Sequence, residues 1–256
     1  MLLLIKLFET NRHFAKKIID MKISDKIILI TGANRGIGSA LVEEALNRGA
    51  RKVYAGTRVA LNHSDKRVIP INLDVTNIAQ IREAASKIDN LDILINNAGV
   101  AFYDDLNDST VLEKHLAVNL YGTQHVTNAF LPAVKEANGA IVNILSILAL
   151  APLPPIASYC ISKAAAFSMT QSLRAFLKGQ KVTVHAVLTG PVDTEMSRGL
   201  EIPKASPGSV VKSIFNGLEN GEEEIFPDQM SASMQQSWNS SSVKNMERQN
   251  AMMVQS

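Results

Sequence analysis

Cysteine is almost absent from the sequence, and histidine is sparse. The only cysteine is Cys160, so no disulfide can form within the chain, and we expect a reducing, cytoplasmic location. The five histidines, at positions 13, 63, 115, 125 and 185, are scattered rather than clustered. This pattern offers no Cys/His metal-binding motif, so we expect no metal site and interpret each histidine as an ordinary surface or core residue.

An excess of charge of one sign is also missing. Lys and Arg number 26 against 24 Asp and Glu, which gives a net charge of +2. Proteins that bind nucleic acids usually concentrate positive charge on one surface or helix. The balance therefore gives no reason to expect a nucleic acid or an acidic surface as partner.

No apolar run is long enough to span a bilayer, which takes about 20 residues. The run Met1–Phe8 is broken by Lys6, and no small-residue cleavage site follows it, so we expect neither a transmembrane helix nor a signal peptide. Residues 1–24 are expected to be an N-terminal extension. Two interpretations of residues 1–20 stay open. One is an amphipathic helix that touches a membrane or a partner; the other is a dangling extension, or an upstream start codon with the real start at Met21.

What the sequence does contain is short β-rich runs that alternate with helical patterns. Several of the runs are apolar throughout, which is typical of parallel strands covered by helices on both faces. The alternation predicts an α/β fold with a doubly wound, Rossmann-like parallel sheet of about seven strands. The expected strands are Lys26–Thr31, Lys52–Ala55, Val68–Ile71, Asp92–Asn96, Ala140–Leu145, Val182–Leu188 and Glu224–Phe226, and the expected helices are Gly38–Arg48, Ile78–Lys87, Val111–Ala137, Ala157–Leu177 and Ser209–Leu218.

The chain is expected to fold as a single domain. With 46% apolar residues it can bury a sizeable core, and no linker or internal repeat interrupts residues 25–228. We assign this range to one dinucleotide-binding and catalytic domain. Residues 229–256 are rich in Ser, Gln, Asn and Met, and we expect a C-terminal tail that is a loose helix or partly disordered.

A glycine-rich turn follows the first expected strand. Residues 31–38 read TGANRGIG, with glycines at 32, 36 and 38. Glycine permits a tight turn and lets a pyrophosphate approach the backbone, and the N-terminus of the next helix favours an anion. By itself the turn leaves two interpretations open, a dinucleotide-binding turn or a purely structural one.

Five further motifs lie in order on the same α/β pattern. They are NNAG at 96–99, Asn119 in a long helical pattern, Ser146 at the end of the fifth strand, YCISK at 159–163, and Gly190-Pro191. Together with the glycine turn they resemble the short-chain dehydrogenase/reductase family over about residues 25–228. The resemblance implies an enzyme that transfers a hydride between a nicotinamide cofactor and a carbonyl or alcohol substrate.

The resemblance also implies four catalytic residues. Tyr159 is the expected general acid for carbonyl reduction, or base for alcohol oxidation, and Ser146 is expected to hydrogen-bond the substrate oxygen. Lys163, one helical turn after Tyr159, is expected to lower the tyrosine pKa and to hold the nicotinamide ribose. Asn119 is expected to anchor a water that links Lys163 to solvent.

The expected cofactor-binding residues come from several loops. Asp74 matches an acidic residue that the family places near the adenine, although it could instead serve the turn that starts a helix. The full expected set is Gly32, Asn34, Arg35, Gly36, Ile37, Gly38, Thr57, Arg58, Asp74, Val75, Asn97, Ala98, Gly99, Lys163, Pro191, Val192 and Thr194.

The end of the second strand bears on which nicotinamide is used. NAD-dependent relatives usually place a carboxylate there to accept from the ribose 2′-hydroxyl, whereas this chain has Thr57 followed by Arg58. A guanidinium can bind a 2′-phosphate through two hydrogen bonds, and Arg35 is a second cation for the same group. We expect NADP(H) to be preferred over NAD(H), with two unrelated surface arginines as the alternative.

The expected substrate region is mostly apolar, and only a short segment of chain is expected to cover it. About 16 residues separate Pro191 from the helix near Pro207, so the lid is short. We expect an uncharged or partly apolar carbonyl or alcohol substrate. The candidate lining residues are Ala101, Phe102, Tyr103, Leu148, Leu153, Pro154, Ile156 and Met196.

Other functions stay open from the sequence. Among enzymes, a 3-oxoacyl reductase is the runner-up, although the apolar Val100–Tyr103 weakens it. A catalytically silent, cofactor-binding redox sensor and an interaction protein that uses its two tails are alternatives from other classes. The long helical patterns near 111–137 and 157–178 resemble those that pair in family oligomers, so we expect a homodimer or homotetramer.

Overall fold

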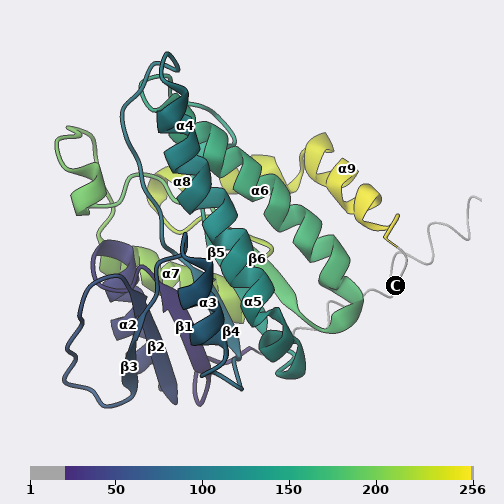
Figure 1. Ribbon diagram of the computed structural model, residues 1–256. Helices are drawn as coiled ribbons and strands as arrows, with labels where there is room; N and C mark the ends of the chain where they lie inside the picture. The colour runs from purple at the N-terminus through teal and green to yellow at the C-terminus, as the bar shows by residue number, and fades with distance from the viewer. Residues whose placement is uncertain (1–20, 255–256) are drawn as a thin grey trace, which may run out of the picture.

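A parallel sheet of seven strands forms the centre of the molecule (Figure 1). The computed structural model describes residues 21–254. The strands are β1 (Ile27–Thr31), β2 (Lys52–Thr57), β3 (Val68–Asn72), β4 (Ile93–Asn96), β5 (Ala140–Ile144), β6 (Thr183–Val187) and β7 (Glu224–Ile225). Their order, β3-β2-β1-β4-β5-β6-β7, reverses direction between β1 and β4. This confirms the expected doubly wound sheet, whose ligands bind at such a reversal point.

Helices cover both faces of the sheet, which explains the apolar strands. The helices α2 (Gly36–Asn47) and α7 (Pro207–Glu219) pack on one face, and α3 (Ile78–Ala85), α5 (Thr123–Glu136) and α6 (Ala157–Leu177) lie on the other (Figure 1). Every residue of β1 and of β5 is buried between these layers. A strand that is buried on both faces does not need polar residues at alternate positions, so its sequence is apolar nearly throughout.

The helix expected over Val111–Ala137 is present from Ser109 to Glu136, but it is not an α-helix throughout. The chain forms α4 (Ser109–His115), then a π-helical segment over Leu116–Gly122, and then α5. A π turn widens the helix by one residue per turn, and such turns occur frequently at functional sites. Here the widened segment contains Asn119.

The last described residues form helices, as one interpretation of the tail allowed, but these helices are packed on the domain rather than loose or disordered. Helix α8 (Gln229–Asn239) and helix α9 (Ser242–Ala251) lie against α6 and the β7 edge (Figure 1). The Trp238 ring of α8 meets the Phe167 ring of α6 edge-on at 5.5 Å between centroids. Lys244 of α9 is fully buried. These contacts make residues 229–251 part of the folded domain.

The domain also begins earlier than residue 25. Met21 and Ile23 are buried in the core between the sheet and its α2 and α7 helices, and the Ile23 N–H donates to Glu219 of α7. The two interpretations of residues 1–20 lie outside the described residues. Within residues 21–254 no helix combines the length and the apolar character that crossing a membrane requires.

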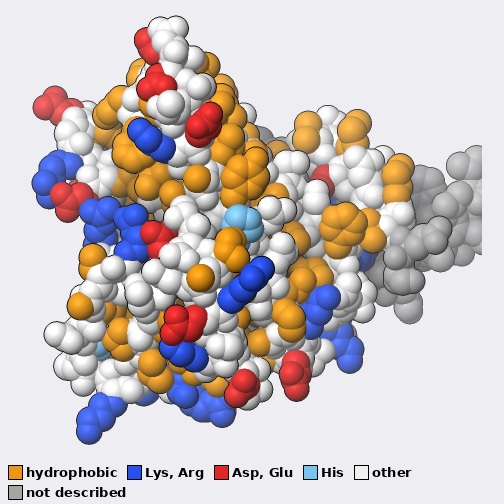
Figure 2. All heavy atoms as spheres, viewed as in Figure 1, with side chains coloured by type: hydrophobic (Ala, Val, Ile, Leu, Met, Phe, Trp, Pro, Cys, Tyr) orange, Lys and Arg blue, Asp and Glu red, His pale blue; other side chains and the backbone are white. Residues whose placement is uncertain are grey.

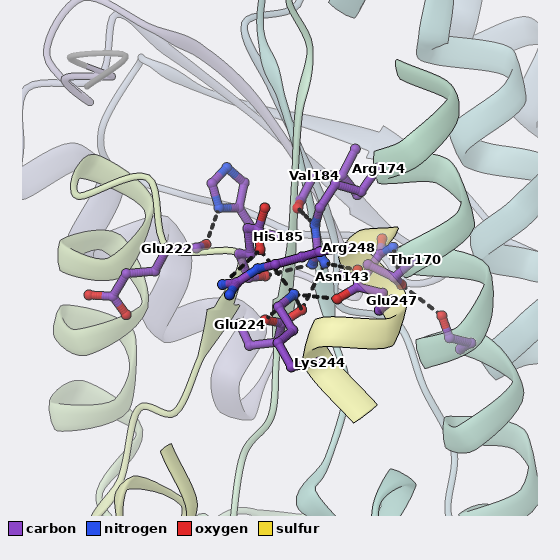
Figure 3. Close-up of polar contacts among 12 residues, drawn as sticks. Asn143, Thr170, Arg174, Val184, His185, Glu222, Glu224, Lys244, Glu247 and Arg248 are labelled. Atoms are coloured by element: carbon purple, nitrogen blue, oxygen red, sulfur yellow. Dashed lines mark hydrogen bonds and ion pairs between the residues drawn. The ribbon is translucent and has the colours of Figure 1, made fainter. Parts of the chain in front are cut away.

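A chain of polar side chains crosses the otherwise apolar middle of the sheet. Asn96 of β4 and Asn143 of β5 are paired in register, and Asn96 Nδ2 donates to Asn143 Oδ1 at 2.8 Å. Asn96 Nδ2 also donates to Thr127 of α5. Asn143 Nδ2 donates to Thr170 of α6, and Figure 3 shows these last two residues. The chain joins both central strands to the two helices above them.

Candidate active site

The glycine turn between β1 and α2 is built so that only glycine fits at its tightest point. Gly32 and Gly36 have positive φ angles of +64° and +55°, which L-residues with a side chain adopt with difficulty. A Cβ on Gly38 would lie 2.0 Å from the Gly32 carbonyl oxygen. The start of α2 has no side-chain cap among the described residues, because Arg35 at the cap makes none. The first N–H groups of α2 are therefore available to an anion such as a pyrophosphate.

The loop after β4 is tied to this turn by Asn97. Its Nδ2 donates to the carbonyl oxygens of Thr31 and Gly32, and the N–H groups of Asn97 and Ala98 donate to Thr31 Oγ1. A Cβ on Gly99 would lie 3.7 Å from Lys163 Nζ. The NNAG loop thus runs between the glycine turn and the lysine at close range.

Asn119 joins the NNAG loop to α6 through its side chain. Asn119 Oδ1 accepts from the Val100 N–H, and Nδ2 donates to the Val100 carbonyl oxygen and to Ser162 Oγ. The side chain is buried and makes all three bonds to protein groups. These bonds give Asn119 a structural role in joining the loop to α6. The expected water relay through Asn119 stays a prediction.

Ser146, Tyr159 and Lys163 converge at the carboxyl end of β5. Ser146 is buried, and its Oγ accepts from the Leu148 N–H, which fixes the turn after the strand. Lys163 Nζ donates to the Ile144 carbonyl oxygen at 2.9 Å and lies 5.7 Å from the centroid of the Tyr159 ring. Ser146 also acts to lower the pKa of the Tyr159 hydroxyl, so the two side chains lie within reach of each other. The three residues expected to perform the chemistry therefore form one cluster.

Burial displaces the pKa values of the tyrosine and the lysine in opposite directions. It raises the pKa of Tyr159 to about 12, although the hydrogen bond with Ser146 acts the other way. It lowers the pKa of Lys163 to about 8. Desolvation of the phenol is the dominant influence on the tyrosine pKa, and the expected effect of Lys163 on that pKa stays a prediction. At neutral pH the phenol is protonated and the amine is mostly charged.

His115 lies in this cluster, although the sequence gave no reason to single it out. The ring is fully buried, with its edge toward Tyr159 at 6.2 Å between centroids. Nε2 accepts from the Phe102 N–H at 3.0 Å, and Nδ1 donates to the Val111 carbonyl oxygen at 2.8 Å. His115 therefore fixes the loop that carries the expected substrate wall.

Asp104 is a second residue that sequence reasoning missed. Its carboxylate accepts from the Ser158 N–H, at 3.2 and 3.3 Å, and from the Ser158 hydroxyl. Helix α6 has no side-chain cap at its own N-cap residue, Ile156. Asp104 supplies that cap from another part of the chain, one residue before Tyr159. Only the folded loop brings Asp104 there, so no local sequence signal marks it.

The residues expected near the adenosine half are present at the ends of β2 and β3. Thr57 is buried, and its Oγ1 accepts from the Val59 N–H at 3.2 Å. Arg58 and Arg35 are exposed, and neither forms a salt bridge within residues 21–254. Asn34 is exposed beside them, whereas Ile37 is half-buried against the core.

Asp74 is engaged in its own turn. Oδ1 accepts from the Thr76 N–H and hydroxyl, at 2.9 and 2.7 Å. Burial acts to raise the pKa of Asp74, but these bonds outweigh it and the pKa is lowered. The turn role, one of the two interpretations, is thus observed. Val75 is buried, and its Cγ2 would lie 2.7 Å from a Cβ on Gly122, so it packs directly on the π segment.

The loop after β6 closes the site from the far side. Thr194 Cγ2 would lie 3.2 Å from a Cβ on Gly36, so Thr194 sits over the glycine turn. Pro191 is half-buried and Val192 is buried beneath the same loop. The Gly190 N–H donates to Asp228 at 2.7 Å. The turns after β1, β4, β5 and β6 therefore meet at one edge of the sheet, as parallel strands require.

Apolar side chains surround the mouth of the site. Phe102, Tyr103, Leu153 and Met196 are exposed, each by at least 45% of its surface. Figure 2 shows hydrophobic side chains gathered over the end of the molecule where Figure 1 places α4. Within the described residues no three His, Cys, Asp or Glu side chains converge as metal ligands do.

Known proteins share both the sequence and the fold. The short chain dehydrogenase family model matches residues 26–204. Short-chain dehydrogenase/reductase 3 from Bos taurus is 34% identical over 220 residues, covering 77% of this chain and 73% of that protein. The 11-beta-hydroxysteroid dehydrogenase-like protein 3 of Arabidopsis thaliana is 32% identical over 253 residues, covering 87% and 79%.

A solved structure has the same fold. The short chain dehydrogenase of Burkholderia cenocepacia J2315, in complex with NADP, is 40% identical and superposes with a TM-score of 0.82, covering 89% of this chain and 98% of that one. Sequence, fold and the cluster around Tyr159 lead to one conclusion. The chain belongs to the short-chain dehydrogenase/reductase family and is an enzyme that acts on alcohol or carbonyl groups with a nicotinamide cofactor.

Proposed function

We propose that this enzyme uses NADP(H) and reduces an uncharged or partly apolar carbonyl compound, or oxidises the corresponding alcohol. The observation that carries the proposal is the cluster of Ser146, Tyr159 and Lys163, in which a protonated phenol stands beside a second hydroxyl and a mostly charged amine. A carbonyl oxygen placed between the two hydroxyls finds two hydrogen-bond donors where negative charge develops.

The protein groups have separate tasks in the reduction. Ser146 and Tyr159 bind and orient the substrate oxygen, and Tyr159 Oη transfers its proton to that oxygen as the carbonyl becomes an alcohol. The nicotinamide, when bound, supplies the hydride to the carbonyl carbon. Lys163, whose amine lies within 6 Å of the phenol ring, stabilises the phenolate left behind, and solvent returns the proton.

The cradle around the glycine turn fits a dinucleotide. The positive φ angles of Gly32 and Gly36, the space that only Gly38 permits, and the uncapped start of α2 all favour a phosphate group. Asn97, Ala98 and Gly99 and the Pro191–Thr194 loop would line the nicotinamide half, with Lys163 at the ribose. Asn119 would act behind Lys163.

Arg35 and Arg58 support a preference for NADP(H). Both side chains are exposed and neither forms a salt bridge among the described residues, although the charge of Arg58 also acts on Asp74; both guanidinium groups can therefore bind a 2′-phosphate. The 40% identical relative from Burkholderia cenocepacia was solved in complex with NADP. Thr57 adds no carboxylate to repel the phosphate. Asp74 and Val75 would lie at the adenine.

Titration of both cofactors against Thr57 variants tests this preference. We expect NADP+ to bind more tightly than NAD+ by about 1–3 kcal/mol, the range of charge-assisted hydrogen bonds. Thr57→Asp keeps an acceptor for the Val59 N–H but adds repulsion, and should reverse the order. Thr57→Ser is the matched control and should keep it. Equal affinity of the wild type for both cofactors would overturn the proposal.

The apolar mouth supports the substrate class. The exposed Phe102, Tyr103 and Leu153 offer area for hydrophobic contact with a substrate. A panel of aldehydes, ketones and alcohols of rising chain length, assayed with NADPH and NADP+, should show kcat/KM increasing with apolar size. A preference for charged substrates would contradict the proposal.

A homodimer or homotetramer is part of the proposal. The outer face of α6 exposes Ile161 and Phe176, two large apolar side chains on one helix, which a second copy of the chain would cover. The test of this assembly belongs with the whole molecule and follows below.

A further inference from the structure

The carboxylate of Asp228 connects the C-terminal helices to the loop after β6. Asp228 is buried, and its Oδ2 accepts from the Gly190 N–H at 2.7 Å. Its Oδ1 accepts from the Ser231 N–H at 3.0 Å and so caps the start of α8. One side chain therefore holds both the turn that leads into Pro191–Thr194 and the N-terminus of α8.

The contact between the two segments is close enough to demand glycine. A Cβ on Gly190 would lie 2.5 Å from Asp228 Oδ1 and 3.3 Å from Met230 Cβ. No real Cβ tolerates a distance under 3.0 Å to such an atom without movement. Displacement of the start of α8 therefore moves the Gly190 turn with it.

Helix α9 holds this arrangement through a buried charge cluster around Lys244. Its Nζ lies 2.8 Å from Glu224, 2.9 Å from Glu223 and 2.5 Å from Glu247, while Arg174 Nη1 lies 2.8 Å from both Glu224 and Glu247 (Figure 3). Lys244 and Glu224 are almost completely buried. Breaking such a buried pair leaves an uncompensated charge, so the cluster opposes release of α9.

Between these two polar anchors, α8 covers an apolar layer under the catalytic residues. Met234 and Trp238 pack against the cluster formed by Leu145, Ala166, Phe167, Ala186, Leu188 and Phe226. Leu145 directly precedes Ser146. The same helix that is capped by Asp228 thus supports the strand end that carries the catalytic serine.

We propose that Asp228 is a positioning residue for the cofactor loop, and that binding of the cofactor and docking of α8 and α9 stabilise each other. The inference rests on the proposed function in one respect, the contact of Pro191–Thr194 with the cofactor. A loop that is already ordered loses less conformational entropy when it binds. Because linkage is reciprocal, a bound cofactor must hold the two helices more firmly by the same factor.

Affinity for NADP+ in Asp228 and Ser231 variants tests the first half. Asp228→Ala removes the bond to Gly190 and should raise the Kd for NADP+ about tenfold, the effect of one lost hydrogen bond. Ser231→Ala loosens the same helix start but leaves the Gly190 bond, so its Kd should change much less. Asp228→Asn, which keeps a carbonyl acceptor, should recover part of the affinity. Equal Kd values in Asp228→Ala and wild type would overturn the inference.

The single tryptophan of the unaltered enzyme can test the second half of the proposal, that a bound cofactor stabilises the docking of α8 and α9. Trp238 lies on α8 against Phe167, so its quenching by acrylamide measures how firmly the helix is docked. Saturating NADP+ should lower the quenching constant of the full chain. Lys244→Met should raise it and weaken NADP+ binding, whereas Arg248→Met, at an exposed neighbour of the cluster, should do neither.

The outcomes separate this inference from the proposed function. Quenching that does not respond to bound NADP+, or a Lys244→Met variant that is quenched more while its Kd stays unchanged, would overturn the coupling alone. A wild-type chain that binds neither NADP+ nor NAD+ would overturn both. If Lys244→Met fails to fold, the response of the wild type to NADP+ still decides.

Discussion

At the scale of single residues, the site depends on burial as much as on residue type. The sequence pointed to Tyr159, Lys163 and Ser146 because their spacing matches a known motif. It did not reveal the direction of the tyrosine pKa, because that depends on how much of the phenol the surrounding loops desolvate. In the structure the pKa of Tyr159 is raised to about 12 and that of Lys163 is lowered to about 8.

These pKa values predict how reduction depends on pH. Below pH 8 Lys163 carries its proton, and above it the ammonium that stabilises the phenolate is progressively lost. Tyr159 stays protonated throughout this range. We expect kcat/KM for carbonyl reduction to be flat below about pH 7 and to fall about tenfold per pH unit well above 8. A rate that stays constant to pH 10, with the fold intact by circular dichroism, would contradict the role of Lys163.

Replacement of Tyr159 separates chemistry from binding. Tyr159→Phe keeps the ring but removes the transferable proton, so kcat should fall at least about 10²-fold while the Kd for NADPH changes little. Lys163→Ala should lower kcat and also weaken NADPH binding. Tyr54→Phe on β2 is the matched control and should retain wild-type turnover. Wild-type turnover in Tyr159→Phe would rule out the proposed mechanism.

At the scale of elements, the periodicity of apolar residues predicted the strands and α-helices but not the π-helical segment. All seven strands were expected, and no bound differs from the expected one by more than two residues. The π segment around Asn119 was not, because the apolar pattern of Val111–Ala137 continues through it. The packing of helix α9 was missed, because the sequence suggests an exposed Lys244 until its partners from β7 and α6 are known.

The start of α6 offers a test at this scale. Asp104→Ala removes the tertiary cap on Ser158, so the free energy of unfolding should fall by about 1–2 kcal/mol, the usual effect of losing a helix cap. Because Tyr159 is the next residue, kcat should fall as well. Asp105→Ala, which breaks only local bonds to Asn107, should stay within about 0.5 kcal/mol of wild type. Equal urea midpoints for the two variants would show that Asp104 does not support α6.

At the scale of the whole molecule, the topology of the sheet brings the site together, and the exposed apolar face of α6 is available for assembly. Four turns meet at the carboxyl edge of the sheet, which the order of motifs along the sequence predicted. The contacts between distant segments, such as Asp228 with Gly190, could not be predicted, because they depend on how loops pack after the sheet has formed.

Light scattering tests the expected assembly. The wild type should have the mass of two or four chains at micromolar concentration. Ile161→Glu with Phe176→Glu places two charges on the exposed apolar positions of α6 and should shift the mass toward one chain. Val243→Glu, at an exposed position of α9, should leave the mass unchanged. A monomeric wild type would contradict the proposed oligomer.

The polar chain through Asn96 and Asn143 decides how β4 and β5 align. Both strands are apolar and covered on both faces, so burial alone distinguishes little between the native pairing and one slipped by a residue. A slip would separate the two amides and break the hydrogen bond between them, which leaves Asn143 Oδ1 without its donor in a buried interior, at a cost of about 1–3 kcal/mol. The asparagines thus determine the register of β4 against β5, because they favour one pairing among several that bury similar apolar area. That selection brings the strand ends, and with them the NNAG loop and Ser146, to the same level.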